Sequence, residues 1–179
     1  PPERGVDFRQ RCGVGRYLGL LDPVQRLSGH HAVRAGAVLV LRRQRNPQIA
    51  AFLKDKDESV ILEAARAIHD VPITDALPAL AELTGEKRVK NHRILERVIN
   101  ARYRLGGAQH AQALAAFASD AAAPEAARRD ALDALSEWGN PSARDRVLNL
   151  WRPLPQRSPA DAAAAIGAAI PTLLKTGSP

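Results

Sequence analysis

Short apolar runs recur along the 179-residue chain about every 33 residues, and this repetition limits the possible folds more than any other feature. Four runs begin at residues 37, 64, 98 and 131, and a weaker fifth run occupies residues 163–167. An interval of this length accommodates two helices and two short turns, which is the repeating unit of an α-solenoid. The sequence therefore predicts pairs of helices stacked side by side.

The composition favours helices over strands. The chain has 33 Ala, 21 Leu and 21 Arg, which favour helices, and only 4% of its residues are aromatic. A hydrophobic fraction of 45% excludes a disordered chain, and a single cysteine, Cys12, excludes a small disulfide-stabilised protein. No run approaches the roughly 18 apolar residues of a membrane span. We expect an all-α fold without a membrane span.

Residues that commonly start or end helices separate the apolar runs. Asn46 is placed to cap a helix with Pro47 at its first position, and Thr74 is placed to cap the next one. Gly106 and Gly107 predict the end of a helix. Besides the helices that contain the apolar runs, shorter helices are expected over 48–53, 75–83, 110–118 and 144–151.

Segment 33–41 and, with one residue inserted, segment 124–135 resemble the second helix of HEAT repeats, in which an apolar residue and an Arg precede a run rich in Ala and Leu. Ile61 and Leu95 replace that Arg in the two repeats between them. The resemblance covers residues 31–151 and implies a single domain, a right-handed α-α superhelix of about four to five helix pairs. Residues 1–30 would then be an atypical N-terminal cap or partial repeat, and 152–179 a C-terminal helix or cap.

Three strings, at 63–73, 99–106 and 144–148, are similar to parts of large bacterial membrane-bound dehydrogenase-like proteins. In those proteins a sugar-dehydrogenase-like β-propeller precedes a HEAT region, and a haem-binding cytochrome c module follows it. The resemblance implies that this chain is a segment of a larger protein, periplasmic or exported, whose redox chemistry lies in other modules. The chain contains no Cys-x-x-Cys-His motif, so it cannot attach a c-type haem through that motif.

Basic residues are concentrated in two parts of the chain. Residues 1–54 carry ten basic and three acidic side chains, which accounts for the whole formal charge of +7. On a helix through 87–104, Lys90, Arg93, Arg97 and Arg104 fall within one narrow stripe. We predict these four residues and Trp151 as a candidate interaction surface. The alternative is that the stripe is simply the solvated outer face of a repeat helix.

Arg102 differs from the stripe because its helical angle lies inside the apolar arc. A buried Arg needs a partner, since the cost of removing its charge from water is otherwise not offset. Arg34 and Arg128 occupy similar inward positions in their own helices, so we expect these three structural arginines to tie adjacent repeats together. The expected partners of Arg102 are Asp70, Asp75 and Glu137.

Few residues suggest catalysis. Cys12 is followed within twenty residues by His30 and His31, so a Cys–His nucleophile pair or a weak metal site is an alternative to an incidental cysteine. The five histidines show no metal-ligand spacing, and Trp138 is expected in the core. We therefore expect neither a cofactor nor an enzymatic activity in this segment.

Three functions follow from these patterns. The first is a non-catalytic HEAT-type scaffold that contacts other protein domains. The second is nucleic-acid binding on a basic concave surface, as in HEAT-like alkylpurine DNA glycosylases. The third is a thiol- or metal-dependent enzyme around Cys12, His30 and His31.

Overall fold

The computed structural model describes residues 30–86 and 88–176, and this part of the chain is helical, without a β-strand. The prediction of an all-α fold is confirmed. In chain order the elements are α2 (His31–Arg43), the 3₁₀ helix η3 (Pro47–Lys54), α3 (Glu58–Asp70), η4 (Thr74–Ala76), α4 (Leu77–Ala81), η5 (Glu82–Gly85), α5 (His92–Leu105), α6 (Ala108–Ser119), α7 (Glu125–Ser136) and α8 (Ala160–Thr176).

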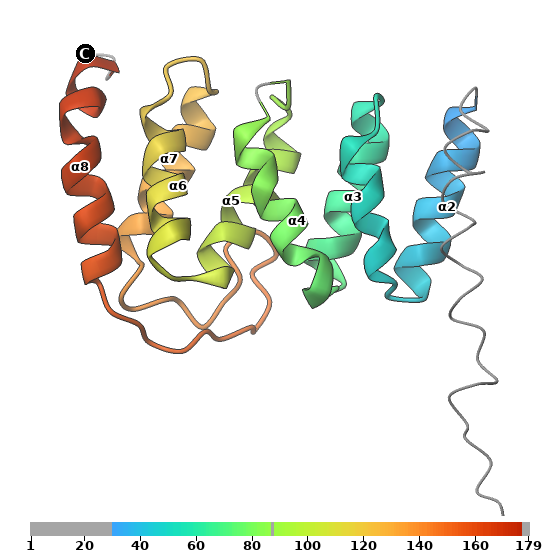
Figure 1. Cartoon of the computed structure of the whole chain (residues 1–179). Coiled ribbons are helices and arrows are strands. Elements are labelled where there is room, and N and C mark those ends of the chain that lie inside the picture. Colours follow the sequence, from blue (N-terminus) through green and yellow to red (C-terminus); the bar gives the residue numbers. More distant parts are fainter. Residues whose placement is uncertain (1–29, 87, 177–179) are drawn as a thin grey trace, which may run out of the picture.

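The helices stand side by side in one row, from α2 at one end to α8 at the other (Figure 1). They form two layers. In layer A, α2 contacts α3, α3 contacts α5, and α5 contacts α7. In layer B, η3 contacts η4 and α4, η5 contacts α6, and α6 contacts α8. The two layers also pack on each other, as α3 does on η3 and α6 does on α7.

The apolar runs in the sequence account for this arrangement. The runs that begin at 37, 64, 98 and 131 lie in α2, α3, α5 and α7, so all four belong to layer A. The weaker run at 163–167 lies in α8, which packs mainly against α6 in layer B. Among the described residues layer A therefore ends at α7, and the fifth run does not continue its series.

The predicted helix starts are confirmed in part. The side chain of Asn46 accepts a hydrogen bond from the backbone N–H of Gln48, and Pro47 is the first residue of η3. The prediction for Thr74 is wrong: it begins η4, and Ile73 takes the capping position without a side-chain hydrogen bond. The expected single helix over 75–83 is divided into η4, α4 and η5.

The predicted helix over 144–151 is also wrong. This segment lies in the connecting loop, which we define as residues 137–159 between α7 and α8. The Asp145 carboxylate accepts hydrogen bonds from the backbone N–H groups of Val147 and Leu148, and this local bonding competes with a helix. Asn149 has a φ of 56°, which bends the chain back on itself. The loop forms an isolated antiparallel bridge between Arg144 and Trp151 instead.

Trp138, at the start of the connecting loop, is fully buried, so the prediction that it belongs to the core is confirmed. The Tyr103 ring meets it edge-on, with 5.9 Å between ring centroids. The Arg157 guanidinium lies 3.8 Å from the centre of the Trp138 ring and donates hydrogen bonds to the carbonyl oxygens of Trp138 and Tyr103. The end of the loop is thereby held on the core.

We expect Gly106→Ala to destabilise the protein more than Gly107→Ala. Both glycines have positive φ, +69° and +82°, where any other residue costs about 1–3 kcal/mol. A Cβ on Gly106 would also lie 2.8 Å from Nη1 of Arg157, whereas a Cβ on Gly107 meets no atom within 4 Å. Urea unfolding measures the difference. Equal losses in the two variants would show that the position of Arg157 contributes nothing.

Candidate functional site

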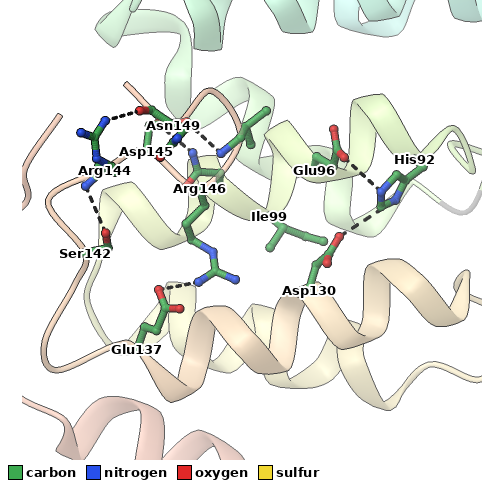
Figure 2. A pocket seen from close by; sticks show the side chains of 12 residues that line it. His92, Glu96, Ile99, Asp130, Glu137, Ser142, Arg144, Asp145, Arg146 and Asn149 are labelled. Carbon is green, nitrogen blue, oxygen red and sulfur yellow. Dashed lines mark hydrogen bonds and ion pairs between the residues drawn. The ribbon is translucent and has the colours of Figure 1, made fainter. Parts of the chain in front are cut away.

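A cavity of about 480 Å³ opens between α5 and α7, with the connecting loop at one end (Figure 2). We call it the α5–α7 groove. Its polar lining residues are His92, Glu96 and Asn100 from α5, Asp130 from α7, and Glu137, Ser142, Arg144, Asp145, Arg146 and Asn149 from the loop.

Side chains of both charges face one another across the groove. The His92 ring lies between two carboxylates, with Nε2 3.0 Å from Glu96 and Nδ1 4.0 Å from Asp130. Within the connecting loop, Arg146 and Glu137 form an ion pair with 2.6 Å between Nη1 and Oε2. Half-exposed pairs such as those of His92 contribute about 1 kcal/mol or less each, whereas Arg146 is more enclosed, with 19% of its side chain exposed. A ligand with its own charges can therefore replace the His92 pairs at little cost.

The floor of the groove is a buried carboxylate. Oδ2 of Asp145 accepts hydrogen bonds from Nδ2 of Asn100 at 3.0 Å and from Nη1 of Arg104 at 3.3 Å. Oδ1 accepts from the backbone N–H groups of Val147 and Leu148, at 3.0 and 2.9 Å. The Asp145 side chain is inaccessible to solvent. These bonds fix the connecting loop to α5.

The side-chain amide of Asn100 also links the loop to α3. Nδ2 of Asn100 lies 2.7 Å from Nε2 of His69, and Nδ1 of His69 lies 2.8 Å from Oδ1 of Asp70. Because an amide NH₂ only donates, the contact with Asn100 suits the tautomer of the neutral His69 ring in which Nε2 accepts and Nδ1 donates to Asp70. Arg97 donates to both oxygens of Asp70, at 3.0 and 2.9 Å. A continuous polar network therefore joins α3, α5 and the loop.

Arg152 makes a second connection between the loop and α3. Its Nη1 donates to the carbonyl oxygen of His69 at 3.0 Å, and its Nη2 to that of Asp70 at 2.7 Å. These carbonyls belong to the last turn of α3, where no intrahelical donor is present. The connecting loop thus reaches back past α5 to a helix more than 80 residues earlier in the chain.

Acid is expected to weaken this network. Burial acts to raise the pKa of Asp70 and Asp145, but hydrogen bonds from His69 and Arg97 to Asp70, and from the backbone N–H groups of Val147 and Leu148 to Asp145, hold both pKa values below the usual 3.8. Such groups stabilise the folded state above pH 3.8, and this contribution is lost as the pH falls through their lower folded pKa values. Urea unfolding at pH 7, 4 and 3 measures the loss.

The matched variants for this pH series are Asp70→Asn in the network and Asp133→Asn on the exposed side of α7. Asp70→Asn should be less stable at pH 7 but lose less stability on acidification. Asp133→Asn should follow the wild-type curve. An unchanged acid dependence in Asp70→Asn would contradict the role given to this carboxylate.

The predicted basic stripe does not form one exposed surface. Lys90 and Arg93 are exposed, but Arg97 is only 8% exposed and bonded to Asp70. Arg104 is partly buried on Asp145 at the other end of α5. The stripe is divided because α3 and α7 cover both flanks of α5. Arg97 and Arg104 are therefore structural residues, which corrects the prediction.

Trp151, the fifth member of the predicted surface, is 70% exposed. It lies in the connecting loop next to Arg152, which contacts the end of α3, and the main chain of Arg152 accepts a hydrogen bond from Arg104. Arg93 and Arg104 are eleven residues apart on α5, or about 16 Å along the helix axis. Trp151 therefore belongs with the loop and not with Lys90 and Arg93.

The inward arginines join helices of different layers. Arg34 of α2 is buried against Asp55, with 2.8 Å between Nε and Oδ2, and Asp55 directly follows η3. Arg128 of α7 is partly buried, and its Nε donates to the carbonyl oxygen of Ala118 in α6 at 2.8 Å. Both contacts connect layer A to layer B.

Arg102 is also buried, but its partners differ from the predicted ones. Nη2 lies 3.3 Å from Glu82, Nε donates to Thr84 at 3.1 Å, and Nη1 lies 3.3 Å from Nδ1 of His110. These residues belong to η5 and α6, the layer B elements on either side of α5. The prediction that Arg102 pairs with Asp70, Asp75 or Glu137 is therefore wrong. Asp70 instead pairs with Arg97, and Glu137 with Arg146.

The carboxylates of the groove were not among the site residues predicted from the sequence. Glu96 and Asp130 are 34 residues apart, one more than the interval of 33 between the runs that begin at 98 and 131 in the same two helices. An alignment of the repeats would have placed them at nearly equivalent positions on neighbouring helices. For Asp145, the feature of the sequence that indicated a loop was the pair Asn140 and Pro141 before it, since both residue types are common in turns.

The proposed Cys–His site lies partly outside the described residues, because Cys12 precedes residue 30. His30 and His31 are both exposed, and Nε2 of His31 lies 2.6 Å from the Ser59 hydroxyl. Within the described ranges, no three His, Cys, Asp or Glu side chains are grouped to hold a metal ion. None of the helices described has both the length and the apolar character needed to cross a membrane.

Comparisons with protein-family models, with curated proteins and with solved structures found no match.

Proposed function

We propose that this chain is a non-catalytic scaffold with a HEAT-like α-solenoid fold, a right-handed superhelix of helix pairs that binds other protein domains. The two-layer row supports the solenoid, since each helix mainly contacts its neighbours and four apolar runs occupy equivalent places in layer A. Stacked helix pairs expose long grooves between neighbouring helices, and such grooves commonly receive segments of other proteins.

The observation that carries the proposal is the α5–α7 groove. It is open to solvent, holds the His92 ring between two carboxylates in exchangeable pairs, and rests on a buried network that fixes its shape. A peptide segment with polar side chains can replace these pairs without leaving a buried charge unpaired. The groove therefore suits a protein ligand that binds along α5 and α7.

The resemblance of strings 63–73, 99–106 and 144–148 supports a second part of the proposal. The scaffold would be one module of a larger exported protein that is related to membrane-bound dehydrogenases and has its redox chemistry elsewhere. The full-length gene tests this part directly. A β-propeller before the helical module and a Cys-x-x-Cys-His motif after it would support the assignment, and their absence would contradict it.

Selection from an unbiased displayed peptide library tests the scaffold function. We expect peptides that bind the chain, and we expect Asp130→Arg, in the groove, to weaken their binding at least about 10-fold, because the longer Arg side chain occupies the space between α5 and α7 that the bound segment needs. Asp133→Arg is the matched control, because Asp133 is exposed on the same helix but does not line the groove. Its binding should stay within about twofold of the wild type.

Nucleic-acid binding is the competing outcome. If no peptide is selected and duplex DNA binds with an affinity that falls steeply between 50 and 200 mM salt, the scaffold proposal is wrong. The first residues to substitute in that case are four exposed basic ones, Lys54, Lys56, Arg88 and Lys90. They lie close together because Arg88, between η5 and α5, donates a hydrogen bond to the carbonyl oxygen of Asp55, just after η3.

A further inference from the structure

The connecting loop holds two large apolar side chains in solvent, Leu150 at 51% and Trp151 at 70% exposure. Trp151 faces Arg144 across an antiparallel bridge. The flanking hydrogen bonds run from Asp145 N to Leu150 O at 2.8 Å and from Arg152 N to Ala143 O at 3.0 Å. This pattern makes Arg144 and Trp151 a non-hydrogen-bonded pair, whose side chains lie close together on the same face.

The bridge is held rigidly. The backbone N–H of Asn149 donates to the carbonyl oxygen of Asp145 at 2.9 Å, and the Arg144 guanidinium donates to the carbonyl oxygen of Asn149 at 2.9 Å. The Asp145 side chain is itself buried in the network with α5. A surface that is ordered before binding loses little conformational entropy when a ligand docks on it. Exposed tryptophan on such a surface is a common centre of protein interfaces.

The charge around the indole is positive. Between residues 142 and 152 the chain carries Arg144, Arg146 and Arg152 against one carboxylate, Asp145, which is buried and hydrogen-bonded. Arg146 is paired with Glu137, whereas Arg144 is exposed and uses one of its five N–H donors on Asn149. An indole beside an exposed guanidinium complements an apolar side chain next to a carboxylate.

We propose that Arg144 and Trp151, with Leu150 beside them, form an anchor for an acidic segment of a partner protein, in which a Leu or aromatic side chain stands next to Asp or Glu. The apolar side chain packs on the indole, and the carboxylate accepts hydrogen bonds from the Arg144 guanidinium. Arg144 and Asn149 also line the α5–α7 groove, so a segment anchored here continues into the groove. The inference thus rests on the proposed scaffold function and names its ligand class.

Peptides selected from the library against the full chain test this anchor. We expect them to be enriched in Asp or Glu adjacent to Leu, Phe or Trp. Trp151→Ala should weaken their binding about 30-fold or more, as for other tryptophan hot spots. Arg144→Glu should weaken it at least about 10-fold by charge repulsion. Arg129→Glu, an exposed charge reversal on α7, is the matched control and should bind as the wild type does.

Circular dichroism and urea unfolding show whether the variants keep the fold, which is expected because both side chains are exposed. Iodide quenching gives an independent measurement, since a positive neighbour attracts this anion. We expect iodide to quench Trp151 more than caesium does, bound peptide to protect it, and Arg144→Glu to remove the preference.

Two outcomes overturn the anchor. In the first, the selected peptides bind Trp151→Ala or Arg144→Glu as tightly as the wild type, but no longer bind Asp130→Arg. The scaffold function then stands and the anchor does not. The other is enrichment of Lys and Arg in the selected peptides. Failure to select any peptide removes the scaffold function and the anchor together.

Discussion

Asp145→Ala is expected to lower the free energy of unfolding by about 3–5 kcal/mol, the usual effect of removing one partner from a buried ion pair. The substitution deprives Arg104 and Asn100 of a carboxylate oxygen and leaves the backbone N–H groups of Val147 and Leu148 without their acceptor. Urea unfolding followed by circular dichroism at 222 nm gives the change. The loop between α7 and α8 should also become more accessible to protease.

Asp145→Asn removes the negative charge of this side chain but keeps its shape. Its amide oxygen can still accept the two backbone hydrogen bonds, but its NH₂ group then faces the donors of Asn100 and Arg104. We expect a loss smaller than that of Asp145→Ala. Asp133→Ala, on the exposed side of α7, should change stability by no more than about 0.5 kcal/mol. A loss below 1 kcal/mol in Asp145→Ala would contradict the structural role of the network.

Trp138→Ala is expected to cost about 3–5 kcal/mol, because a fully buried tryptophan is replaced by a cavity. The variant also removes the edge contact of Tyr103 and the surface on which Arg157 stacks. Arg157 holds the end of the connecting loop to the carbonyl oxygens of Trp138 and Tyr103. The loss should therefore include detachment of the loop, measured as faster hydrogen exchange in residues 152–159.

Trp151→Ala is the matched control, because this tryptophan is 70% exposed in the same loop. Its stability should stay within about 0.5 kcal/mol of the wild type. Trp138→Phe, which keeps an aromatic ring against Tyr103, should lose less than Trp138→Ala. Equal stability losses for Trp138→Ala and Trp151→Ala would contradict the assignment of Trp138 to the core.

Much of the helical architecture could be predicted from the sequence, because the signals that determine it are local. Asn46 with Pro47 starts η3, and Gly106 with Gly107 separates α5 from α6, as predicted. Local signals failed where a side chain supplies an alternative to the helix. The Asp145 carboxylate satisfies two backbone N–H groups itself, so an apolar-periodic segment became a turn.

The polar network could not be predicted, because its members come from three separate parts of the chain. Helical angles correctly assigned Arg102 to the interior but placed Arg97 on an exposed stripe. The angle of a residue shows which side of its own helix it lies on, but not whether a neighbouring helix covers that side. Arg97 is buried because α3 lies beside α5 and supplies Asp70 as its partner.

The contact of Arg152 with the end of α3 also changes how the row can unfold. In a simple row of repeats, each unit depends only on its neighbours, so units at the ends open first and opening spreads inward. Here the chain after α7 returns to α3 and closes a ring of contacts through α3, α5 and α7. We therefore expect these three helices to unfold as one cooperative unit. α2 and η3 lie outside the ring, and we expect their amide hydrogens to exchange with solvent through separate, less costly openings.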